Sequence, residues 1–592
     1  MNGFIIANVK FPGKLREYDD TAKRARFGDF FVCYQPDEKF PEDKVFFDND
    51  EYFILLDGVI LNASELKEKH EASDMTALCL ALIQSEGDIF FGGFIGNYAG
   101  VYYDKKSKRL VVFTNKLSSR QVFYYAKDGV FIASTLITDI KDILKYHSIP
   151  YSFNRDAAYL MLNYGYMGTD DTFIQEVKKI EAGYEIIFDG KNATPVRYHH
   201  FTNHTYNLSK TSEDEIIKGI DERFRRAIDR EYKKDTEAGW SYHLRTLSGG
   251  TDSRACAFVS HYLGYQNVIN LTYGVPERPD EVIAREIAEY FGDNFIFMSN
   301  LPMKDSASFI CNIDEAVYKS QGLSYYLEAA QSTKQHIIID DSTFGLTHGG
   351  AFSEGFLTTG YIQEPTLQPP VQPLHTYSSL LREKMPLKHL SKYENDDIYS
   401  IYSIFFNKHN PTGRNIVEYS PNNVFPGLDD DLVSYCLSIP IEKRKHYYIY
   451  HKWLFETYPD AADFKLEKLN ARPKDGKIKK FYGHIMRYGD VLQYFRNSKD
   501  ELPSRLQKRF NLKKKIKPSN NALMPFDWWF SSDPKVRSYM RNYLRENIKN
   551  PILDRELRED LIYMYKNGLA REKSMALTVV AAAKLFFDKE RI

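Results

Sequence analysis

The sequence predicts two domains: a β-rich α+β domain over residues 1–205, and an α/β domain with a parallel sheet over residues 206–592 that ends in helices. Three observations predict this division. The 592 residues are too many for one hydrophobic core. Alternating patterns with turn residues dominate the first 205 residues, whereas strand and helix patterns alternate after them. Such alternation is typical of a parallel sheet covered by helices.

The first domain is predicted from strand and turn signals. Residues 52–62 contain two apolar runs around Asp57-Gly58, which predicts a hairpin turn. A helix is expected over residues 75–85, capped by Ser73-Asp74. A polar stretch without periodicity between Val196 and Ser212 marks the domain boundary. Further strands are expected at residues 94–104, 109–115, 121–125 and 129–134.

The second domain begins with a helix predicted over residues 213–232. This helix leads into a strand at 242–247, a Gly-Gly turn and a second helix. Another strand at 267–273 and another helix at 279–288 continue the alternation. Parallel sheets of this kind bind ligands at the carboxyl ends of their strands. The turn that follows Leu247 is therefore the first candidate site.

That turn is Ser248-Gly249-Gly250-Thr251-Asp252-Ser253. The unpaired N–H groups and positive dipole end of the following helix favour an anion there. The glycines let the backbone approach a phosphate, and the two serine hydroxyls add donors. Asp252 would repel a phosphate directly, so we expect it to hold Mg²⁺ between itself and the phosphates. An ordinary glycine-rich turn with a serine cap is the alternative.

This S-G-G-x-D-S arrangement resembles the pyrophosphate loop of the ATP-pyrophosphatase enzymes, which cleave ATP between its α and β phosphates. It lacks the lysine of a Walker A loop. The resemblance implies that Leu247 and the loop bind pyrophosphate. It also implies that the strand end at Leu271, Tyr273 and Gly274 lies near the adenine. Asp280-Glu281-x-x-Ala284 resembles the D-E-x-x-A helix of the same family, with an acidic first turn as the alternative.

A second loop motif is His348-Gly349-Gly350. It resembles the second loop of asparagine synthetases and β-lactam synthetases, and most closely a His-Gly-Gly sequence of lasso-peptide cyclases. The resemblance implies that both glycines lie at the nucleotide and that His348 accepts a proton from an attacking amine. A hydrogen-bonded structural histidine is the alternative. Ala351 stands where the family has a metal-binding aspartate, so Glu354 is the candidate to join Asp252 at the metal.

A third segment, residues 424–440, resembles the P-[YF]-L-D-x-x-[LV]…L-P segment of the synthetases. In those enzymes a lysine downstream neutralises charge as the adenylate is attacked. Lys452 and Lys445 are the candidates for this role, and the match of residues 455–459 to the family's helix end favours Lys452. Ordinary surface lysines are the alternative, because an aromatic helix often carries lysine on its solvated face.

The first domain resembles the class II glutamine amidotransferase domain, a four-layer sandwich in which two sheets lie between helices. Residues 57–62, 95–99 and 123–134 carry the resemblance. Active members use an N-terminal cysteine whose thiol attacks glutamine, but Asn2 stands at that position. Residues 115–120 also depart from the family loop. We therefore expect a domain that folds but does not hydrolyse glutamine.

Composition excludes several classes of function. The chain has 79 Lys+Arg and 80 Asp+Glu, so its charge does not favour nucleic acid. Its five scattered cysteines lack a C-x-x-C pair, which favours a reducing, cytoplasmic setting over disulfides or zinc. No membrane span or signal peptide is expected. The proline-rich run 364–373 is expected to be a lid or a surface loop, and the basic tracts 474–480 and 508–517 solvated faces.

Together the resemblances imply an ATP-dependent carbon–nitrogen ligase of the asparagine-synthetase type that uses ATP and Mg²⁺. A substrate carboxylate would attack the α-phosphate, and an amine would then attack the acyl-adenylate. The first hypothesis is macrocyclisation of a lasso peptide or another natural product. Its partners would be a small-molecule or peptide substrate, a protease and a leader-binding protein. The alternatives are ammonia-dependent amidation of an amino acid or sugar acid, and a nucleotide-binding pseudo-synthetase.

Overall fold

The computed structural model describes most of the chain. Asn2, Ala351, nearly all of the proline-rich run and the basic tract 508–517 lie outside the described residues. Among the described helices, none is both long enough and apolar enough to cross a membrane. The described ranges are 3–12, 18–300, 310–331, 343–350, 353–360, 365, 376–403, 422–467, 472–473, 478–481, 484–487 and 525–588.

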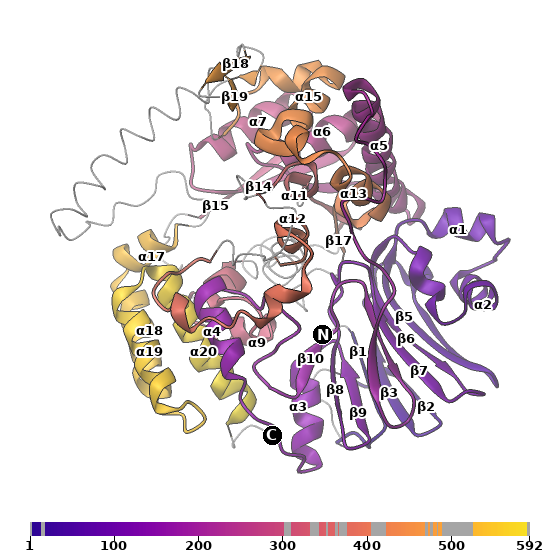
Figure 1. Ribbon diagram of the computed structural model, residues 1–592, viewed down its shortest axis with the longest axis vertical. Coiled ribbons are helices and arrows are strands. Elements are labelled where there is room, and N and C mark those ends of the chain that lie inside the picture. The colour runs from indigo at the N-terminus through magenta and orange to yellow at the C-terminus, as the bar shows by residue number, and fades with distance from the viewer. Residues whose placement is uncertain are drawn as a thin grey trace.

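The N-terminal part contains two six-stranded sheets of antiparallel pairs, with orders β10-β8-β9-β1-β3-β2 and β12-β11-β7-β6-β5-β4 (Figure 1). The strand pairs predicted at 94–115 and 121–134 are confirmed, although they belong to different sheets. The strands are β1 Gly3–Ala7, β2 Lys23–Phe27, β3 Phe30–Gln35, β4 Val45–Asp48, β5 Tyr52–Ile60, β6 Gly96–Asp104, β7 Arg109–Thr114, β8 Phe123–Lys127, β9 Val130–Ser134, β10 Val177–Lys179, β11 Tyr184–Phe188 and β12 Ala193–Arg197.

The hairpin predicted at Asp57-Gly58 is wrong, because β5 runs through both residues as one strand. Gly58 has φ +132°, and a Cβ placed on it would lie 2.2 Å from the carbonyl oxygen of Asn97 in β6. Glycine is needed here for close approach of two strands, not for a turn. An Asp-Gly pair between apolar runs gives the same sequence signal in both cases.

Buried clusters show how helices cover the two sheets. One cluster joins residues of both sheets, including Phe4, Phe53 and Val101, so the sheets pack face to face. Helix α2 (Met75–Glu86), capped by Asp74 as predicted, packs with α1 (Ala63–Lys69) on the outer face of the second sheet. Helix α3 (Ile137–Tyr146) packs on the outer face of the first. The amidotransferase-like sheets therefore have helices on both outer faces.

The second part contains a parallel sheet with order β15-β14-β13-β16-β17, which confirms the predicted α/β arrangement. Its strands are β13 His243–Thr246, β14 Val268–Gly274, β15 Asn294–Ser299, β16 Thr347–His348 and β17 Asn423–Val424. The predicted helices appear as α5 Glu213–Glu237, α6 Thr251–Tyr262 and α7 Pro279–Phe291. They are joined by α11 Ser353–Leu357, α12 Asp396–Tyr399, α13 Asp430–Leu437, α14 Ile441–Arg444 and α15 Tyr448–Thr457.

The C-terminal helices share a core with helices from much earlier in the chain. Residues of α4 (Arg155–Tyr164), α9 (Ile313–Lys319) and α20 (Ala570–Phe587) belong to one buried cluster, and these helices lie together in Figure 1. The buried face of α4 thus packs on the C-terminal helices, although α4 precedes the expected boundary at residue 205. The other elements are α17 Phe526–Ser532, α18 Pro534–Asn547, α19 Arg555–Asn567, and the pair β18 Ile478–Phe481 and β19 His484–Arg487.

Candidate active site

The predicted pyrophosphate loop lies at the carboxyl end of β13, between that strand and α6. Gly250 is the N-cap residue of α6, so the first N–H groups of the helix face the loop without intrahelical acceptors. The Ser248 N–H donates to Ser253 Oγ at 3.0 Å, and the Gly250 N–H donates to Ser248 Oγ at 3.2 Å. The two serine hydroxyls thus hold the loop in a tight turn around the helix N-terminus.

Asp280 fixes the same loop from α7. Its Oδ1 accepts a hydrogen bond of 3.1 Å from the Gly249 N–H, and burial raises the pKa of its carboxyl group. A Cβ on Gly249 would lie 3.1 Å from the Pro279 carbonyl oxygen. Asp280, for which an acidic first turn is the alternative role, is therefore a direct contact of the loop.

Arg254 holds the loop from the interior of the protein. It is fully buried, and its guanidinium donates to the carbonyl oxygens of Ala461 and Phe464 at 3.1 and 3.0 Å and also to the Gly249 oxygen at 3.5 Å. Burial lowers the pKa of Arg254 to about 10. Its contacts are backbone carbonyls, so Arg254 has a structural role: it connects the loop to residues 461–464.

Asp252 lies in the first turn of α6 and is only partly buried. The Tyr450 hydroxyl donates to its Oδ1 at 2.9 Å, and the Glu354 N–H donates to its Oδ2 at 3.1 Å. The Tyr447 hydroxyl donates to Glu354 Oε1. The two predicted metal ligands are therefore neighbours beside the loop, but the contact between them is made by the Glu354 N–H, and the Glu354 carboxylate is held by Tyr447. Carboxylate oxygens are ligands that Mg²⁺ takes in phosphate sites, and the Asp252 carboxylate at the helix N-terminus is the group that fits the implied metal.

The second glycine-rich motif packs directly against this turn. A Cβ on Gly350 would lie 2.4 Å from the Ser253 nitrogen and 2.6 Å from the Asp252 carbonyl carbon. The Gly349 N–H donates to the Val424 oxygen at 2.8 Å. Only glycine at position 350 therefore allows the strand end of β16 to touch the start of α6.

The strand end predicted to lie near the adenine is next to the loop. Leu271 pairs with Thr246 in register, and the Leu247 N–H donates to the Leu271 oxygen at 3.0 Å. Tyr273 and Gly274 continue β14 beyond this pair to the same edge of the sheet. The position of a nucleotide base at this edge stays a prediction.

His348 does not face the loop. It is 1 % exposed, and its Nε2 lies 2.9 Å from Asp235 Oδ2, while its Nδ1 lies 3.5 Å from Glu231 Oε2. Its ring stacks on Tyr232 with centroids 4.0 Å apart. These three partners belong to α5. In this arrangement the imidazole is enclosed by protein groups, so the geometry favours the structural alternative over proton transfer with a substrate.

Two further groups complete that enclosed cluster. His243 Nδ1 lies 3.1 Å from Asp235 Oδ2, and the Leu346 N–H donates to Asp235 Oδ1 at 2.7 Å. Burial alone would lower the pKa of His348, but its hydrogen bond to Asp235 and the nearby Glu231 carboxylate outweigh burial and raise it. Burial alone would raise the pKa of Asp235, but the two histidines hold it below its ordinary value. We name Asp235, His243, His348 and Glu231 the buried histidine cluster.

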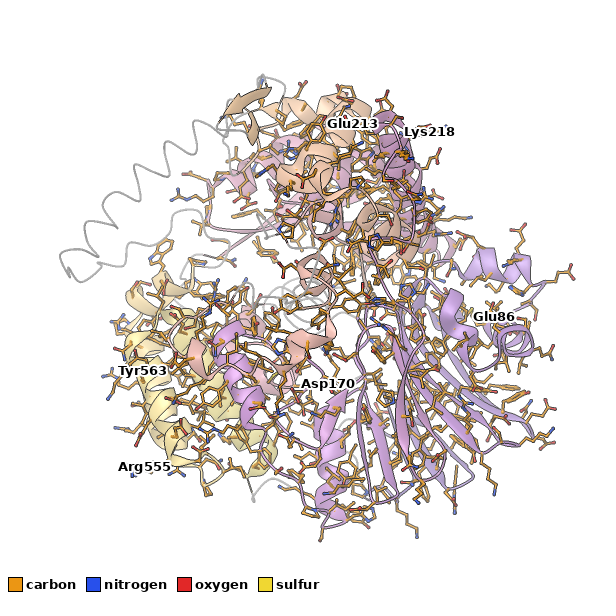
Figure 2. All side chains as sticks on the ribbon, in the orientation of Figure 1. Glu86, Asp170, Glu213, Lys218, Arg555 and Tyr563 are labelled. Atoms are coloured by element: carbon orange, nitrogen blue, oxygen red, sulfur yellow. The ribbon has the colours of Figure 1, made fainter. Side chains whose placement is uncertain are left out.

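The two candidate lysines are engaged in ion pairs. Lys452 Nζ lies 2.8 Å from Glu213 Oε2 at the start of α5, a residue labelled beside Lys218 in Figure 2. Lys445 Nζ lies 3.0 Å from Glu442. Because helical residues advance about 100° each, Lys452 points roughly opposite to Tyr450, which faces Asp252. Lys452 is thus paired with α5, and Lys445 with Glu442 of α14.

Sequence reasoning missed the aromatic groups that do reach the loop. Besides Tyr447 and Tyr450, His451 Nε2 lies 3.4 Å from Thr251 Oγ1. Burial, followed by the charge of Asp252, raises the pKa of Tyr450 well above its ordinary value. Tyr450 and His451 lie in the first turn of α15, and Tyr447 is its N-cap residue. The run of aromatic residues at the start of this helix is a signal in the sequence, but it does not say what these residues contact.

The N-terminal domain contains its own buried charge cluster. Arg120 forms an ion pair with Asp57, and the Tyr34 hydroxyl donates to Asp57 Oδ1 at 3.0 Å. Burial would lower the pKa of Arg120, but the charges of Asp57 and Asp37 outweigh burial and raise it. Residues 115–120, which depart from the amidotransferase loop, thus supply Arg120 to neutralise Asp57, the first of the residues 57–62 that carry the resemblance.

Comparison with known proteins adds information on the first domain. A family model described as a glutamine amidotransferase domain matches residues 44–199, which confirms the amidotransferase resemblance there. The match begins after Asn2 and does not include the nucleophile position. No curated protein sequence matches the chain significantly.

Solved structures give weak likenesses. A glutamine phosphoribosylpyrophosphate amidotransferase from B. subtilis shares 11 % identity, with 50 % of this chain and 59 % of that chain covered and a TM-score of 0.22. An NMN synthetase from Francisella tularensis shares 12 % identity, with 43 % and 97 % covered and a TM-score of 0.19. An NAD⁺ synthetase from Burkholderia pseudomallei shares 11 %, with 43 % and 97 % covered and a TM-score of 0.18. The chain therefore spans less than two thirds of the amidotransferase, and TM-scores this low carry no argument about activity.

Proposed function

We propose that the protein is an ATP-dependent carbon–nitrogen ligase that activates a carboxylate as its adenylate at the loop after β13. The observation that carries this proposal is the position of the partly buried Asp252 carboxylate at the N-terminus of α6, beside the Gly249-Gly250 turn and against the Glu354 N–H. A helix N-terminus offers N–H donors to phosphate, and a carboxylate beside it suits a metal that neutralises phosphate charge.

Each residue of the loop has a role in this proposal. Ser248, Gly249, Gly250 and Ser253 bind pyrophosphate, and Asp280 and Arg254 hold the loop in shape. Asp252 and Glu354 would hold Mg²⁺, which when bound neutralises phosphate charge. Tyr450 orients the Asp252 carboxylate by its hydrogen bond. His451, whose Nε2 lies 3.4 Å from Thr251 Oγ1, replaces the two lysines as the candidate side chain beside the loop.

The amine comes from the substrate itself or from ammonia in this proposal. Asn2 immediately precedes β1, and an amide side chain is not a nucleophile for glutamine. The buried ion pair between Asp57 and Arg120 supports an N-terminal domain whose charges are neutralised by its own residues. Closure of a peptide by its own amine, as in lasso-peptide cyclases, is the finer hypothesis, and ammonia-dependent amidation is its alternative.

The test is to incubate the protein with ATP, Mg²⁺ and panels of amino acids and peptides while following AMP, ADP and pyrophosphate. We expect substrate-dependent formation of AMP and pyrophosphate. Formation of ADP would contradict adenylation, and no nucleotide product with any carboxylate would favour the nucleotide-binding pseudo-synthetase. Release of glutamate from glutamine would contradict the inactive amidotransferase domain.

A further inference from the structure

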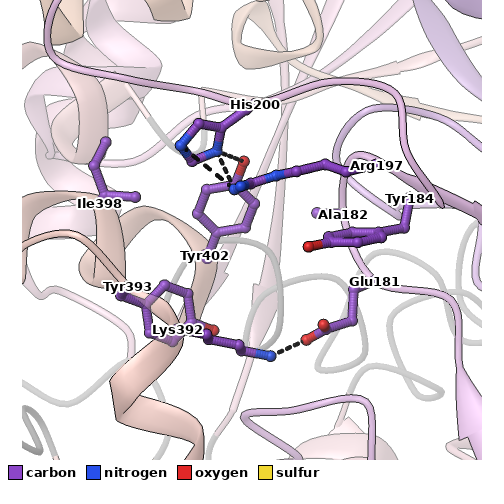
Figure 3. Close-up of a pocket in the computed structure, with 9 residues that line it drawn as sticks. All are labelled: Glu181, Ala182, Tyr184, Arg197, His200, Lys392, Tyr393, Ile398 and Tyr402. Carbon is purple, nitrogen blue, oxygen red and sulfur yellow. Dashed lines mark hydrogen bonds and ion pairs between the residues drawn. The ribbon is translucent and has the colours of Figure 1, made fainter. Parts of the chain in front are cut away.

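Side chains from distant parts of the chain meet both in the pocket of Figure 3 and at the start of α15. In the pocket, dashed lines join Lys392 to Glu181 and Arg197 to His200, so these groups satisfy one another. At the start of α15, hydroxyl donors are instead directed at the carboxylates beside the glycine-rich loop. This second arrangement indicates what holds Asp252 in position.

Both carboxylate oxygens of Asp252 are held from outside α6. The Tyr450 hydroxyl donates to Oδ1 at 2.9 Å, and the Glu354 N–H donates to Oδ2 at 3.1 Å. Burial, followed by the charge of Asp252, raises the pKa of Tyr450 well above its ordinary value, so this hydroxyl stays a donor at neutral pH. A carboxylate offers about four lone pairs, so these two bonds alone do not exhaust its capacity for a cation.

Glu354 is itself held by the segment that leads into α15. The Tyr447 hydroxyl donates to Glu354 Oε1. The guanidinium of the buried Arg444 donates at 2.6 Å to the carbonyl oxygen of Thr358, the residue that follows α11. Two hydrogen bonds of 2.7 and 3.0 Å to the Asp397 carboxylate fix Arg444 in turn. Residues 444–447 therefore hold α11 near its start and at its end.

The backbone makes an unusual turn between α14 and α15. His446 and Tyr447 have φ angles of +53° and +61°, in the left-handed region that residues with a Cβ rarely occupy. Within the described part of the chain, they are the only adjacent non-glycine residues with positive φ. Such conformations persist where the surrounding contacts impose them, and they cluster at functional sites. Arg444 supplies these contacts before the turn, and the bond of 2.9 Å from the Tyr448 hydroxyl to Glu213 supplies them after it.

We propose that Tyr447 is a positioning residue for the metal site. It holds Glu354, whose N–H fixes Asp252 Oδ2. Tyr450 holds Oδ1 of the same carboxylate directly, and we call Tyr447 and Tyr450 the tyrosine clamp. A carboxylate that is held at both oxygens has less freedom to lose when a cation binds, so the clamp lowers the Mg²⁺ concentration that fills the site. This inference rests on the proposed function, which assigns Asp252 to Mg²⁺.

The test is equilibrium binding of a nonhydrolysable ATP analogue to the full chain over a series of Mg²⁺ concentrations. Tyr447→Phe keeps the ring, which stacks on His451 with centroids 5.1 Å apart, but removes the hydroxyl. We expect it to raise the Mg²⁺ concentration for half-maximal binding by about threefold or more. Binding without Mg²⁺ should stay within about twofold of wild type, because the loop N–H groups are unchanged. This difference separates a loss of positioning from general damage to the loop.

Tyr448→Phe is the matched control. Tyr448 is the next residue and also donates its hydroxyl to a glutamate, but that residue, Glu213, belongs to α5 and pairs with Lys452. This variant should leave the half-maximal Mg²⁺ concentration within about twofold of wild type. In a Glu354→Ala background, Tyr447→Phe should have no further effect, because the hydroxyl acts through Glu354.

Two substitutions of the exposed His446 test the backbone turn. Glycine accepts positive φ and a β-branched residue does not. His446→Val should therefore raise the half-maximal Mg²⁺ concentration as Tyr447→Phe does, whereas His446→Gly should leave it within about twofold. Wild-type binding that does not respond to Mg²⁺ would overturn the proposed function. A wild type that responds, with Tyr447→Phe equal to it or to Tyr448→Phe, would overturn the role of Tyr447 alone.

Discussion

Two carboxylate-centred clusters flank strand β13, and they differ in what completes them. At its start, Asp235 is fully buried, and its oxygens accept from two histidines and the Leu346 N–H. At its end, Asp252 is partly buried beside a helix N-terminus, with Tyr450 and the Glu354 N–H as partners. The first cluster is closed by protein groups, whereas the second lies at the sheet edge where parallel-sheet proteins bind ligands.

The comparison teaches that residue type alone does not mark a catalytic group. A histidine before two glycines resembled an acid–base residue, yet His348 stacks on Tyr232 beneath α5. The aspartate in the glycine-rich turn is the one at a helix N-terminus with a second acid beside it. Burial and the direction of the side chain decide between structural and chemical roles, and both depend on tertiary packing.

The largest effect is expected from Asp252→Asn. With a suitable substrate, AMP formation should fall by at least about 100-fold, because a neutral amide is a poor ligand for Mg²⁺. Circular dichroism and the midpoint of thermal unfolding should show a folded protein, since the side chain is not in the core. Retained turnover would show that Asp252 does not serve the chemistry.

Asp235→Ala is expected to lower the stability of the fold, whereas Asp252→Asn is expected to lower activity. Removing the central carboxylate leaves His243 and His348 buried without their partner, so the free energy of unfolding should fall by about 3–5 kcal/mol. Urea unfolding measures this change, with Asp50→Ala on the exposed surface as control. A loss below about 1 kcal/mol would mean that the buried histidine cluster does little for stability.

Gly350→Ala tests the contact between the β16 end and α6. The added Cβ meets the Ser253 nitrogen at 2.4 Å, so the first turn of α6 must shift, and we expect a loss of stability of about 1–3 kcal/mol together with weaker ATP binding. Gly92→Ala is the control, because nothing lies within 4 Å of its added Cβ. Equal behaviour of the two variants would contradict this packing.

His348→Phe keeps a ring against Tyr232 but removes the titrating group. Because the pKa of His348 is raised in the folded state, its protonation stabilises the fold fully below about pH 6.5 and loses this effect as the pH rises through the folded pKa. The difference in unfolding free energy between wild type and variant should therefore shrink as the pH rises above about 6.5. A difference that grows with pH would refute the assigned direction.

The smallest effect is expected from Lys452→Ala. The exposed pair with Glu213 contributes about 0–1 kcal/mol, and AMP formation should change by less than about threefold because the lysine points away from the loop. His451→Ala is the informative partner variant, since His451 lies beside Thr251. If Lys452→Ala lost far more activity than His451→Ala, the lysine would have to leave Glu213 during turnover.

The sequence was sufficient for much of the fold and for part of the site. Periodicity placed α2, α5, α6, α7 and the parallel strands β13 and β14, because local patterns determine these elements. The local pattern predicted a turn at Gly58, where a Cβ would meet the Asn97 carbonyl oxygen of the neighbouring strand. It also did not place Tyr450 or His451 against the loop. Each of these contacts joins residues far apart in the chain, and a local pattern carries no information on such distances.

The most direct test of the central claim is equilibrium binding of a nonhydrolysable ATP analogue, with and without Mg²⁺, to wild type, Asp252→Asn and His348→Phe. We predict that Mg²⁺ strengthens binding of the analogue. Asp252→Asn should weaken this binding by about tenfold or more, and His348→Phe should change it by no more than about twofold. Binding that is lost in His348→Phe but unchanged in Asp252→Asn would show that the two clusters have been assigned the wrong way round.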